Sequence, residues 1–564
     1  MKQIDNILSA VSNNRKSHFW IFFAVLLMLS FVMIYFYQPL CPGQDFFFHY
    51  RRFQALMDGM QNSSFLIYID STAIDGYGYF TKAFYSDFIL IPFALIGNLT
   101  SIEFAYQFMI FTMTVLCGVF TYLFVNRVYK NPLAAAISAL LFTFCVYRLL
   151  DIYHRAALGE SLSFTFIPLV FWGLYEIIKG DYRKWYILTI GYSLMIFTHV
   201  ISSVLMFMTM LIFLIIYSKS LFSDRKRVYS LIIAGIVTLV IVAYYLYPMI
   251  EQMMSNTFYY QSREIMSKAA DSGLQIHWLI WGLFSGIVAP AQAFIPGIGV
   301  LLTCIVFLRL FINLKSAQLK SLDIGIIIGI VYIFAASSFF PWKIFPFSLL
   351  NFIQMGWRLF EFTSFFFAIA GGYYLALLLK TNKRRLFGGT VICIAILFVF
   401  INDSKMYEIY RCGRPVTQEA AFSNDYHLGG LEYIPEKVPS IEYIHQRGNK
   451  VDYARIEKTA DISNMKKNKG ITSFDLKTDT KDILELPLIY YKGYTAKLND
   501  EKIPVTESDN GLIEISVDAP GKVTVYYGGT SIQKISFFLT LAGIVGLCVY
   551  IFMSSRRKQH EKNV

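Results

Sequence analysis

Several side chains able to do acid–base or phosphate chemistry follow closely on the first long apolar run of the chain. Asp45 precedes His49, Arg51 and Arg52, so a carboxylate is followed by an imidazole and two guanidinium groups at roughly helical spacing. Charged groups at the boundary between lipid and water are costly unless they serve a function. Asp45 is therefore interpreted as a catalytic base or substrate anchor, and the three basic residues as a phosphate clamp. A solvated loop beside the membrane is the alternative.

Four further candidates stand at the ends of later apolar runs: Arg155, Glu160, His199 and Arg358. Each also has a purely structural interpretation. Arg155 and Glu160 could form a salt-bridged loop, and His199 could be a polar turn residue. Arg358, which follows a tryptophan, could extend its charge to the membrane interface, as arginines there commonly do.

These residue types suit group transfer from a lipid-linked phosphate donor. Cations hold the phosphate leaving group and neutralise its growing charge, and the guanidinium fork can bind two phosphate oxygens at once. A carboxylate can take the proton of an acceptor hydroxyl. The sequence has no Walker loop, no Gly-rich dinucleotide motif and no His-rich metal motif, which argues against a nucleotide-driven mechanism.

The composition is that of a polytopic membrane protein. The chain has 564 residues, of which 56% are hydrophobic and 17% aromatic. Its net charge of +12 comes from short basic clusters between apolar runs, so we expect no nucleic-acid partner. Seven cysteines stand singly without metal-ligand spacing, although Cys41 and Cys412 would both face outward and could pair.

Twelve membrane spans are expected, and the charge distribution orients them. With the N-terminus in the cytoplasm, 23 lysines and arginines fall on the inside and nine in the short outside segments. This excess on the inside is the usual bias of membrane proteins, so both termini are predicted to be cytoplasmic. The expected spans are 18–37, 104–126, 132–149, 161–178, 185–197, 200–217, 228–248, 294–312, 323–339, 359–379, 386–402 and 535–553.

This topology depends on how two segments are assigned. Residues 86–98 are too few to span and contain a proline, so they are predicted to form an interfacial or re-entrant helix. Residues 185–218 are divided into a helical hairpin that turns at Thr198-His199 on the outside. A single long tilted helix is the alternative, and it would invert every later span.

The chain is divided into a transmembrane domain (1–402, with a first outer loop at 38–103), an extracytoplasmic β-rich domain (403–531) and a last span with a basic tail (532–564). Alternating apolar residues predict strands at 489–498, 511–517 and 521–527. Turn residues such as Asn499-Asp500 and Pro520-Gly521 separate these strands.

The chain resembles the YfhO-like bacterial membrane proteins of the GT-C glycosyltransferase superfamily over nearly its whole length. It looks closest to a branch labelled as membrane proteins related to 6-pyruvoyl-tetrahydropterin synthase, although nothing in it resembles that soluble enzyme. Four short elements carry the likeness: Gly43-Gln-Asp45 with His49 and Arg51/Arg52, Arg155-Ala-Ala-Leu-Gly-Glu160, Gln354-Met-Gly-Trp-Arg358, and the closing β segment 491–527.

The resemblance implies a GT-C fold with catalysis on the outer face. The donor would be a sugar on undecaprenyl phosphate and the acceptor an envelope glycopolymer, such as a teichoic acid or other wall polysaccharide. Asp45 would be the general base, Arg155, Arg358 and Arg52 would hold the donor phosphate, and Glu160 would position acceptor or sugar. Gly356 and Leu359 depart from the usual proline and phenylalanine of the family's element.

No cofactor is expected, and the first loop has one Asp near the span where a metal site would favour an Asp-x-Asp pair, so a divalent metal is left open. Two other function classes compete with the enzyme. A transporter or flippase of lipid-linked sugars would carry polar residues at mid-span and an inverted repeat. A non-catalytic envelope-assembly partner would use the β-rich domain for binding and would not need Asp45.

Overall fold

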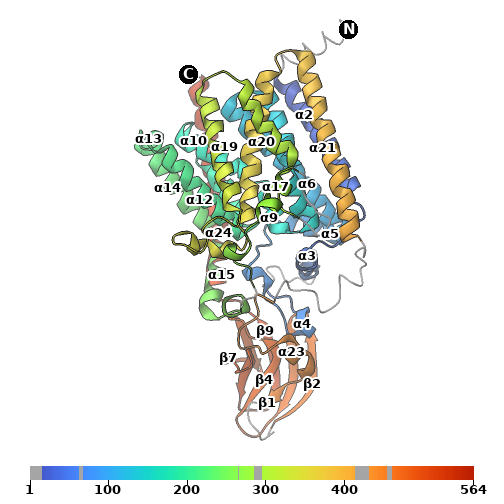
Figure 1. The fold of residues 1–564 in the computed structure, drawn as a ribbon. Coiled ribbons are helices and arrows are strands. Elements are labelled where there is room, and N and C mark those ends of the chain that lie inside the picture. Colours follow the sequence, from blue (N-terminus) through green and yellow to red (C-terminus); the bar gives the residue numbers. More distant parts are fainter. Residues whose placement is uncertain are drawn as a thin grey trace.

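The chain is a helical membrane protein with a β domain near its C-terminus (Figure 1). The β domain extends from one end of the helical bundle, and the C-terminus lies near the other end. This computed structural model describes residues 15–61, 68–263, 266–284, 295–412, 431–453 and 460–563.

Within these ranges, seven helical segments are long and apolar enough to cross a membrane, and a bent pair would make an eighth. All twelve expected spans fall on helical segments, but the number that cross stays a prediction. The seven are α2 (Arg15–Phe36), α6 (Ile102–Tyr129), α7 with α8 and the π-helical turn η2 (Pro132–Thr143, Val146–Leu149, Leu150–His154), α19 (Ala317–Ala335), η7 with α20 (Gly356–Leu359, Phe360–Leu378), α21 (Asn382–Arg411) and α24 (Ser531–Asn563).

Shorter helices complete the bundle and its ends. The bent pair, α14 (Arg225–Ile241) and α15 (Ala243–Ser255), makes an angle of 69°. The segment expected to be interfacial contains α5 (Ile91–Leu99), which is too short to span. The others include α3 (Phe46–Gln61), α9 (Leu158–Ser163), α10 (Ile167–Ile178), α11 (Tyr186–Ile196), α12 (Val200–Ile216), α17 (Ile276–Phe284) and α18 (Gly299–Ile305).

Residues 185–218 form two helices, α11 and α12, that are joined by a turn, as the expected hairpin requires. The break between α11 and α12 lies at Thr198, whose carbonyl oxygen closely approaches Gly159 at the start of α9. The far end of α12 returns to the end of α10, where Lys179 Nζ lies 4.1 Å from the centre of the Tyr217 ring. The segment therefore runs out and back along α10, while its orientation across the membrane stays a prediction.

The β domain is a sandwich of two antiparallel sheets, with strand orders β1-β4-β8-β7 and β2-β3-β9-β5-β6. Alternating residues such as Leu484 and Ile515 from one sheet and Phe474 and Val525 from the other form its core. Strands expected at 511–517 and 521–527 match β8 and β9, whereas Gly493, at φ +124°, breaks the run 489–498. The strands are β1 (Asp452–Tyr453), β2 (Asp461–Asn468), β3 (Ile471–Lys477), β4 (Asp482–Ile489), β5 (Tyr494–Leu498), β6 (Glu501–Ile503), β7 (Val505–Glu507), β8 (Leu512–Val517) and β9 (Gly521–Tyr527).

An aromatic cluster joins the β domain to the first loop of the bundle. Phe84 stacks on Tyr433 with ring centroids 4.0 Å apart, and Phe80 stacks on Tyr491 at 5.2 Å. The backbone nitrogen of Ile489 donates to the Tyr77 carbonyl oxygen at 3.0 Å. The first loop is thereby held between the bundle and the β domain.

The start of the first loop is also fixed to the end of α21. Cys41 and Cys412 form a disulfide bond, which the sequence left as a possibility, with Cα atoms 5.2 Å apart. The Tyr407 hydroxyl accepts from the Cys41 nitrogen at 2.6 Å and donates to the Cys41 carbonyl oxygen at 2.8 Å. Helix α21 itself continues to Arg411, past the expected end of its span at residue 402.

We predict that Cys41→Ser and Cys412→Ser each lower the unfolding temperature of the detergent-solubilised protein, and that the double variant is no less stable than either. The disulfide closes a loop with a sequence separation of 371 residues, and such links stabilise by about 2–5 kcal/mol. Cys304→Ser, which removes an exposed free thiol, is the control. Unchanged unfolding temperatures in both single variants would contradict a formed disulfide.

Candidate functional site

The first loop lies directly along the segment that carries Arg155. The backbone nitrogen of Asp45 donates to the Arg155 carbonyl oxygen at 2.7 Å, and that of Gln44 donates to the His154 carbonyl oxygen at 3.3 Å. A Cβ atom on Gly43 would lie 2.6 Å from the Tyr153 carbonyl oxygen, so only glycine permits this approach. The first two elements of the sequence pattern therefore form one site.

A buried carboxylate, Glu160, organises the arginines of this site. Its Oε2 atom accepts from Arg155 Nη1 at 2.9 Å and lies 3.3 Å from Arg358 Nε, and its Oε1 accepts from the Tyr147 hydroxyl at 2.7 Å. Arg155 also donates to Asp151 Oδ1 at 2.5 Å. The expected ion pair between Arg155 and Glu160 thus exists, but it is part of a larger buried network.

Local backbone geometry brings these groups together. The π-helical turn that ends at His154 places the Arg155 nitrogen 2.9 Å from the Leu150 carbonyl oxygen, and such turns often occur at functional sites. Burial opposes ionisation of Glu160, but Arg155 and then Arg358 lower its pKa to about 2. Glu160 is therefore charged throughout the physiological range.

Arg358 enters the site from the 3-10 turn that precedes α20. Its Nη2 atom donates to Gln354 Oε1 at 2.8 Å, whereas its Nη1 atom is buried without a hydrogen-bond partner among the described residues. A Cβ atom on the neighbouring Gly356 would lie 2.7 Å from the Ala335 carbonyl oxygen. The chain therefore has no room for a proline at this position.

Asp45 keeps its side chain open to solvent, although the network beside it is buried. The surrounding protein removes part of its hydration and raises the pKa of Asp45, while Arg155 and Arg358 act in the opposite direction. A carboxylate with a raised pKa is a stronger base than an ordinary aspartate and remains available to a substrate.

Helix α3 adds His49 and Arg52 to the same region. Asp45, Arg52 and Arg358 all shift the pKa of Tyr85, whose net rise comes mainly from burial. Burial, followed by Arg52, lowers the pKa of His49 well below its usual value, so this imidazole is neutral at pH 7. Arg52 Nε lies 3.5 Å from Asp87 Oδ1, but its Nη1 has no hydrogen-bond partner among the described residues, and neither has His49 Nδ1.

His199 closes the site from the turn between α11 and α12. Its Nδ1 accepts from the Ser202 nitrogen at 3.3 Å and so caps α12, as the structural interpretation expected. Burial, followed by Arg358, lowers its pKa to about 3. Gly159 lies against His199 and the Thr198 carbonyl oxygen, which shows that the hairpin turn packs on the second element.

Arg51 lies apart from this group. It donates to Asp70 Oδ2 at 3.2 Å and to Gln54 Oε1 at 3.1 Å, and it also donates to the Thr72 hydroxyl. Its neighbours belong to the first loop, so Arg51 positions that loop. The structure thus brings together Asp45, His49, Arg52, Arg155, Glu160, His199 and Arg358.

Sequence reasoning missed Asp403, which is buried against His154, the residue before Arg155. Asp403 Oδ1 lies 3.0 Å from His154 Nε2, and its other oxygen accepts from the Tyr37 hydroxyl. Asp403 directly follows an apolar run, so it was assigned to the soluble domain. Its closeness to the apolar run is the feature of the sequence that could have indicated a buried carboxylate and not one solvated in a loop.

Neither a protein-family model nor a curated protein sequence matches the chain. Within the described ranges, no group of three or more His, Cys, Asp or Glu side chains is arranged to hold a metal ion. Arg52 and Arg358 each keep a side-chain nitrogen without a hydrogen-bond partner among the described residues, and a guanidinium group of this kind can bind an anion.

We predict that Glu160→Gln destabilises the protein more than Arg358→Gln does. Removing the carboxylate leaves two buried guanidinium charges poorly compensated, which typically costs about 3–5 kcal/mol. Removing Arg358 leaves Glu160 paired with Arg155, and the expected cost is about 1–3 kcal/mol. Thermal unfolding in detergent at pH 7 measures both.

Because the pKa of Glu160 is lowered, its contribution is fully present above the usual glutamate value of about 4.3 and is lost as the pH falls toward 2. An equal or larger loss of stability in Arg358→Gln would contradict the central place of Glu160.

Proposed function

We propose that the protein is a membrane glycosyltransferase that moves a sugar from a polyprenyl-phosphate donor to an envelope glycopolymer on the extracytoplasmic face. The donor would be an undecaprenyl-phosphate sugar, and the acceptor a teichoic acid or other wall polysaccharide. The resemblance to GT-C proteins and the arrangement around Asp45 both support this proposal.

One observation carries the proposal: a solvent-accessible carboxylate stands beside buried guanidinium groups with unbonded nitrogens. Buried donors without partners are costly, at about 1–3 kcal/mol each, and are rare unless a ligand completes them. Arg52 Nη1 and Arg358 Nη1 are such donors, and a lipid phosphate supplies the matching acceptor oxygens. Asp45 would then stand where an acceptor hydroxyl could approach.

The chemistry follows from these roles. The acceptor hydroxyl oxygen forms a bond to the anomeric carbon of the sugar as the bond from that carbon to the phosphate oxygen breaks. Asp45 takes the hydroxyl proton, and the polyprenyl phosphate leaves with its charge neutralised by Arg358 and Arg52. His49 and His199, both neutral, suit hydrogen bonds to sugar hydroxyls. Arg155, which pairs with both Asp151 and Glu160, would keep these side chains in position.

We predict that Asp45→Asn lowers sugar transfer about 10²–10⁴-fold, the usual contribution of a general base. In a deletion strain that produces either form at equal membrane levels, the variant should lose one sugar substituent of its envelope polymers. Asp58→Asn is the matched control, because Asp58 is an exposed aspartate near the far end of α3, the helix that follows Asp45. Full decoration by Asp45→Asn would exclude it as the base and favour a lipid-linked-sugar transporter or an assembly partner.

The pH dependence of transfer gives a second prediction. The base must be deprotonated, so activity should fall as the pH drops through the raised pKa of Asp45. Arg358 lowers that pKa, so the residual activity of Arg358→Gln should fall at a higher pH than that of the wild type. Initial rates measured in membranes from pH 4 to 8 test this, and an acid limb that moves downward in Arg358→Gln would contradict the assignment.

A further inference from the structure

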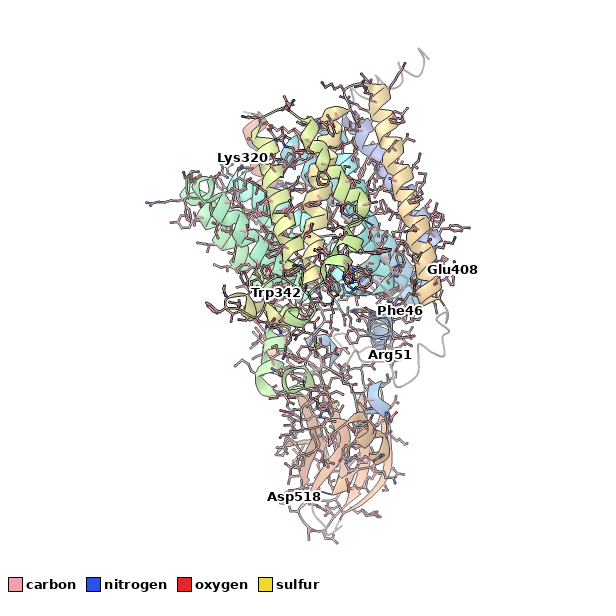
Figure 2. The ribbon with its side chains drawn as sticks, in the orientation of Figure 1. Phe46, Arg51, Lys320, Trp342, Glu408 and Asp518 are labelled. Atoms are coloured by element: carbon pink, nitrogen blue, oxygen red, sulfur yellow. A yellow bond between two sulfur atoms is a disulfide. The ribbon has the colours of Figure 1, made fainter. Side chains whose placement is uncertain are left out.

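A cavity lies in the helical bundle, toward the end remote from the β domain. Its volume is about 120 Å³, and side chains of α6, α10, α12, α19 and α20 line it. Lys320, which directly precedes the lining residue Ser321, marks this end of the bundle, opposite Asp518 of the β domain (Figure 2). The cavity is therefore separate from the site around Asp45.

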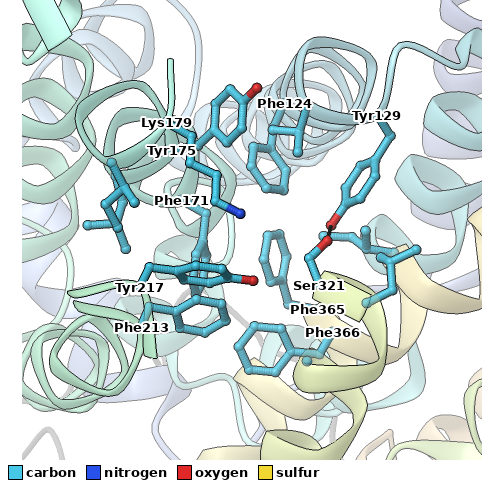
Figure 3. Close-up of a pocket in the computed structure, with 16 residues that line it drawn as sticks. Phe124, Tyr129, Phe171, Tyr175, Lys179, Phe213, Tyr217, Ser321, Phe365 and Phe366 are labelled. Carbon is cyan, nitrogen blue, oxygen red and sulfur yellow. Dashed lines mark hydrogen bonds between the residues drawn. The ribbon is translucent and has the colours of Figure 1, made fainter. Parts of the chain in front are cut away.

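The wall of this cavity is aromatic, and its polar groups are few. Phe124, Phe171, Phe213, Phe365 and Phe366 surround it. Figure 3 shows the Lys179 amine and the Tyr217 hydroxyl directed into the space between these rings. An apolar chamber with an ammonium and a hydroxyl group suits a ligand with one apolar and one anionic part.

The charge at this end of the cavity is not neutralised by neighbouring carboxylates. Glu176 accepts from Arg127 Nε at 2.6 Å, and Asp323 Oδ1 accepts from Arg309 Nε at 2.9 Å, so each already has a cation. No carboxylate among the described residues pairs with Lys179, whose Nζ instead lies over the Tyr217 ring at 4.1 Å. Burial and the nearby charge of Lys320 both lower the pKa of Lys179, which indicates local positive repulsion.

The outer surface next to the cavity is apolar. On α12, Leu211 and Ile215 are exposed, and Phe222 follows at the end of the hairpin with 71% of its surface exposed. Such a surface on a membrane helix faces lipid chains, so a bilayer lipid can reach the cavity without crossing water. Free phosphate would make no favourable contact with the aromatic wall, whereas a lipid would contact both the aromatic rings and the polar groups of the site.

We propose that this cavity binds an anionic phospholipid of the bilayer, with the phosphate at Lys179 and Tyr217 and a short chain segment between the aromatic rings. The volume limits what enters, because a cavity of about 150 Å³ holds one benzene-sized group. The phospholipid head thus stays at the mouth, where Lys320 adds a second positive charge. This site is independent of the glycosyltransferase proposal.

The test is the affinity of the full-length, detergent-solubilised protein for phosphatidylglycerol, measured by native mass spectrometry. Lys179→Gln and Gly325→Leu should each weaken binding about tenfold or more, the first by removing the charge and the second by filling the chamber. Lys219→Gln removes an exposed lysine at the same end of the bundle and should bind like the wild type. Equal unfolding temperatures of the variants would show that loss of binding is not loss of folding.

Two further ligands show which parts of the lipid the site recognises. Phosphatidylcholine should bind about tenfold more weakly, because its head has no net charge, and millimolar inorganic phosphate should not displace the lipid. Unchanged binding by both Lys179→Gln and Gly325→Leu would overturn the proposal. Displacement by inorganic phosphate would also overturn it, since the site would then be a simple anion site.

Discussion

The need to neutralise a buried carboxylate, Glu160, organises the end of the helical bundle that faces the β domain. A charge with 1% exposure is tolerated only when cations and hydrogen-bond donors surround it. Arg155 and Arg358 come from segments about 200 residues apart, and both reach the same oxygen. The ion network thereby fixes where the π-helical turn and the start of α20 meet, and the candidate site depends on that meeting.

Close backbone contacts then bring the remaining elements to this network. Gly43 lets the first loop lie along residues 153–156, and Gly159 lets the hairpin turn lie on α9. The disulfide from Cys41 and the aromatic contacts of Phe80 and Phe84 hold the two ends of the loop. Asp45 is consequently placed by backbone hydrogen bonds while its side chain stays exposed.

Local patterns in the sequence predicted the elements well. Apolar length predicted the helices, and alternation with turn residues predicted β8 and β9 almost to the residue. The seven site residues that converge share one signal in the sequence, a polar or charged side chain next to an apolar run, which is costly there unless it serves a function. Arg51 has the same signal but a different role, because which face of α3 it occupies depends on Asp70, a contact that spacing alone does not reveal.

Contacts between residues far apart in the sequence could not be predicted from local patterns. Asp403 lies 249 positions from its partner His154 in the sequence. It is buried because α21 continues as a helix beyond the apolar run, to Arg411. The cavity at Lys179 is built from five separate helices, so no local motif marks it. Helix ends and alternation are local properties, whereas burial of a charge is decided by what packs against it.

The most direct test of the account is a cryo-electron microscopy structure of the protein in lipid nanodiscs with undecaprenyl phosphate. We expect phosphate density within hydrogen-bond distance of Arg358 Nη1 and Arg52 Nη1, beside an unoccupied Asp45 carboxylate. Lipid phosphate bound elsewhere, with both arginine nitrogens still unbonded, would contradict it.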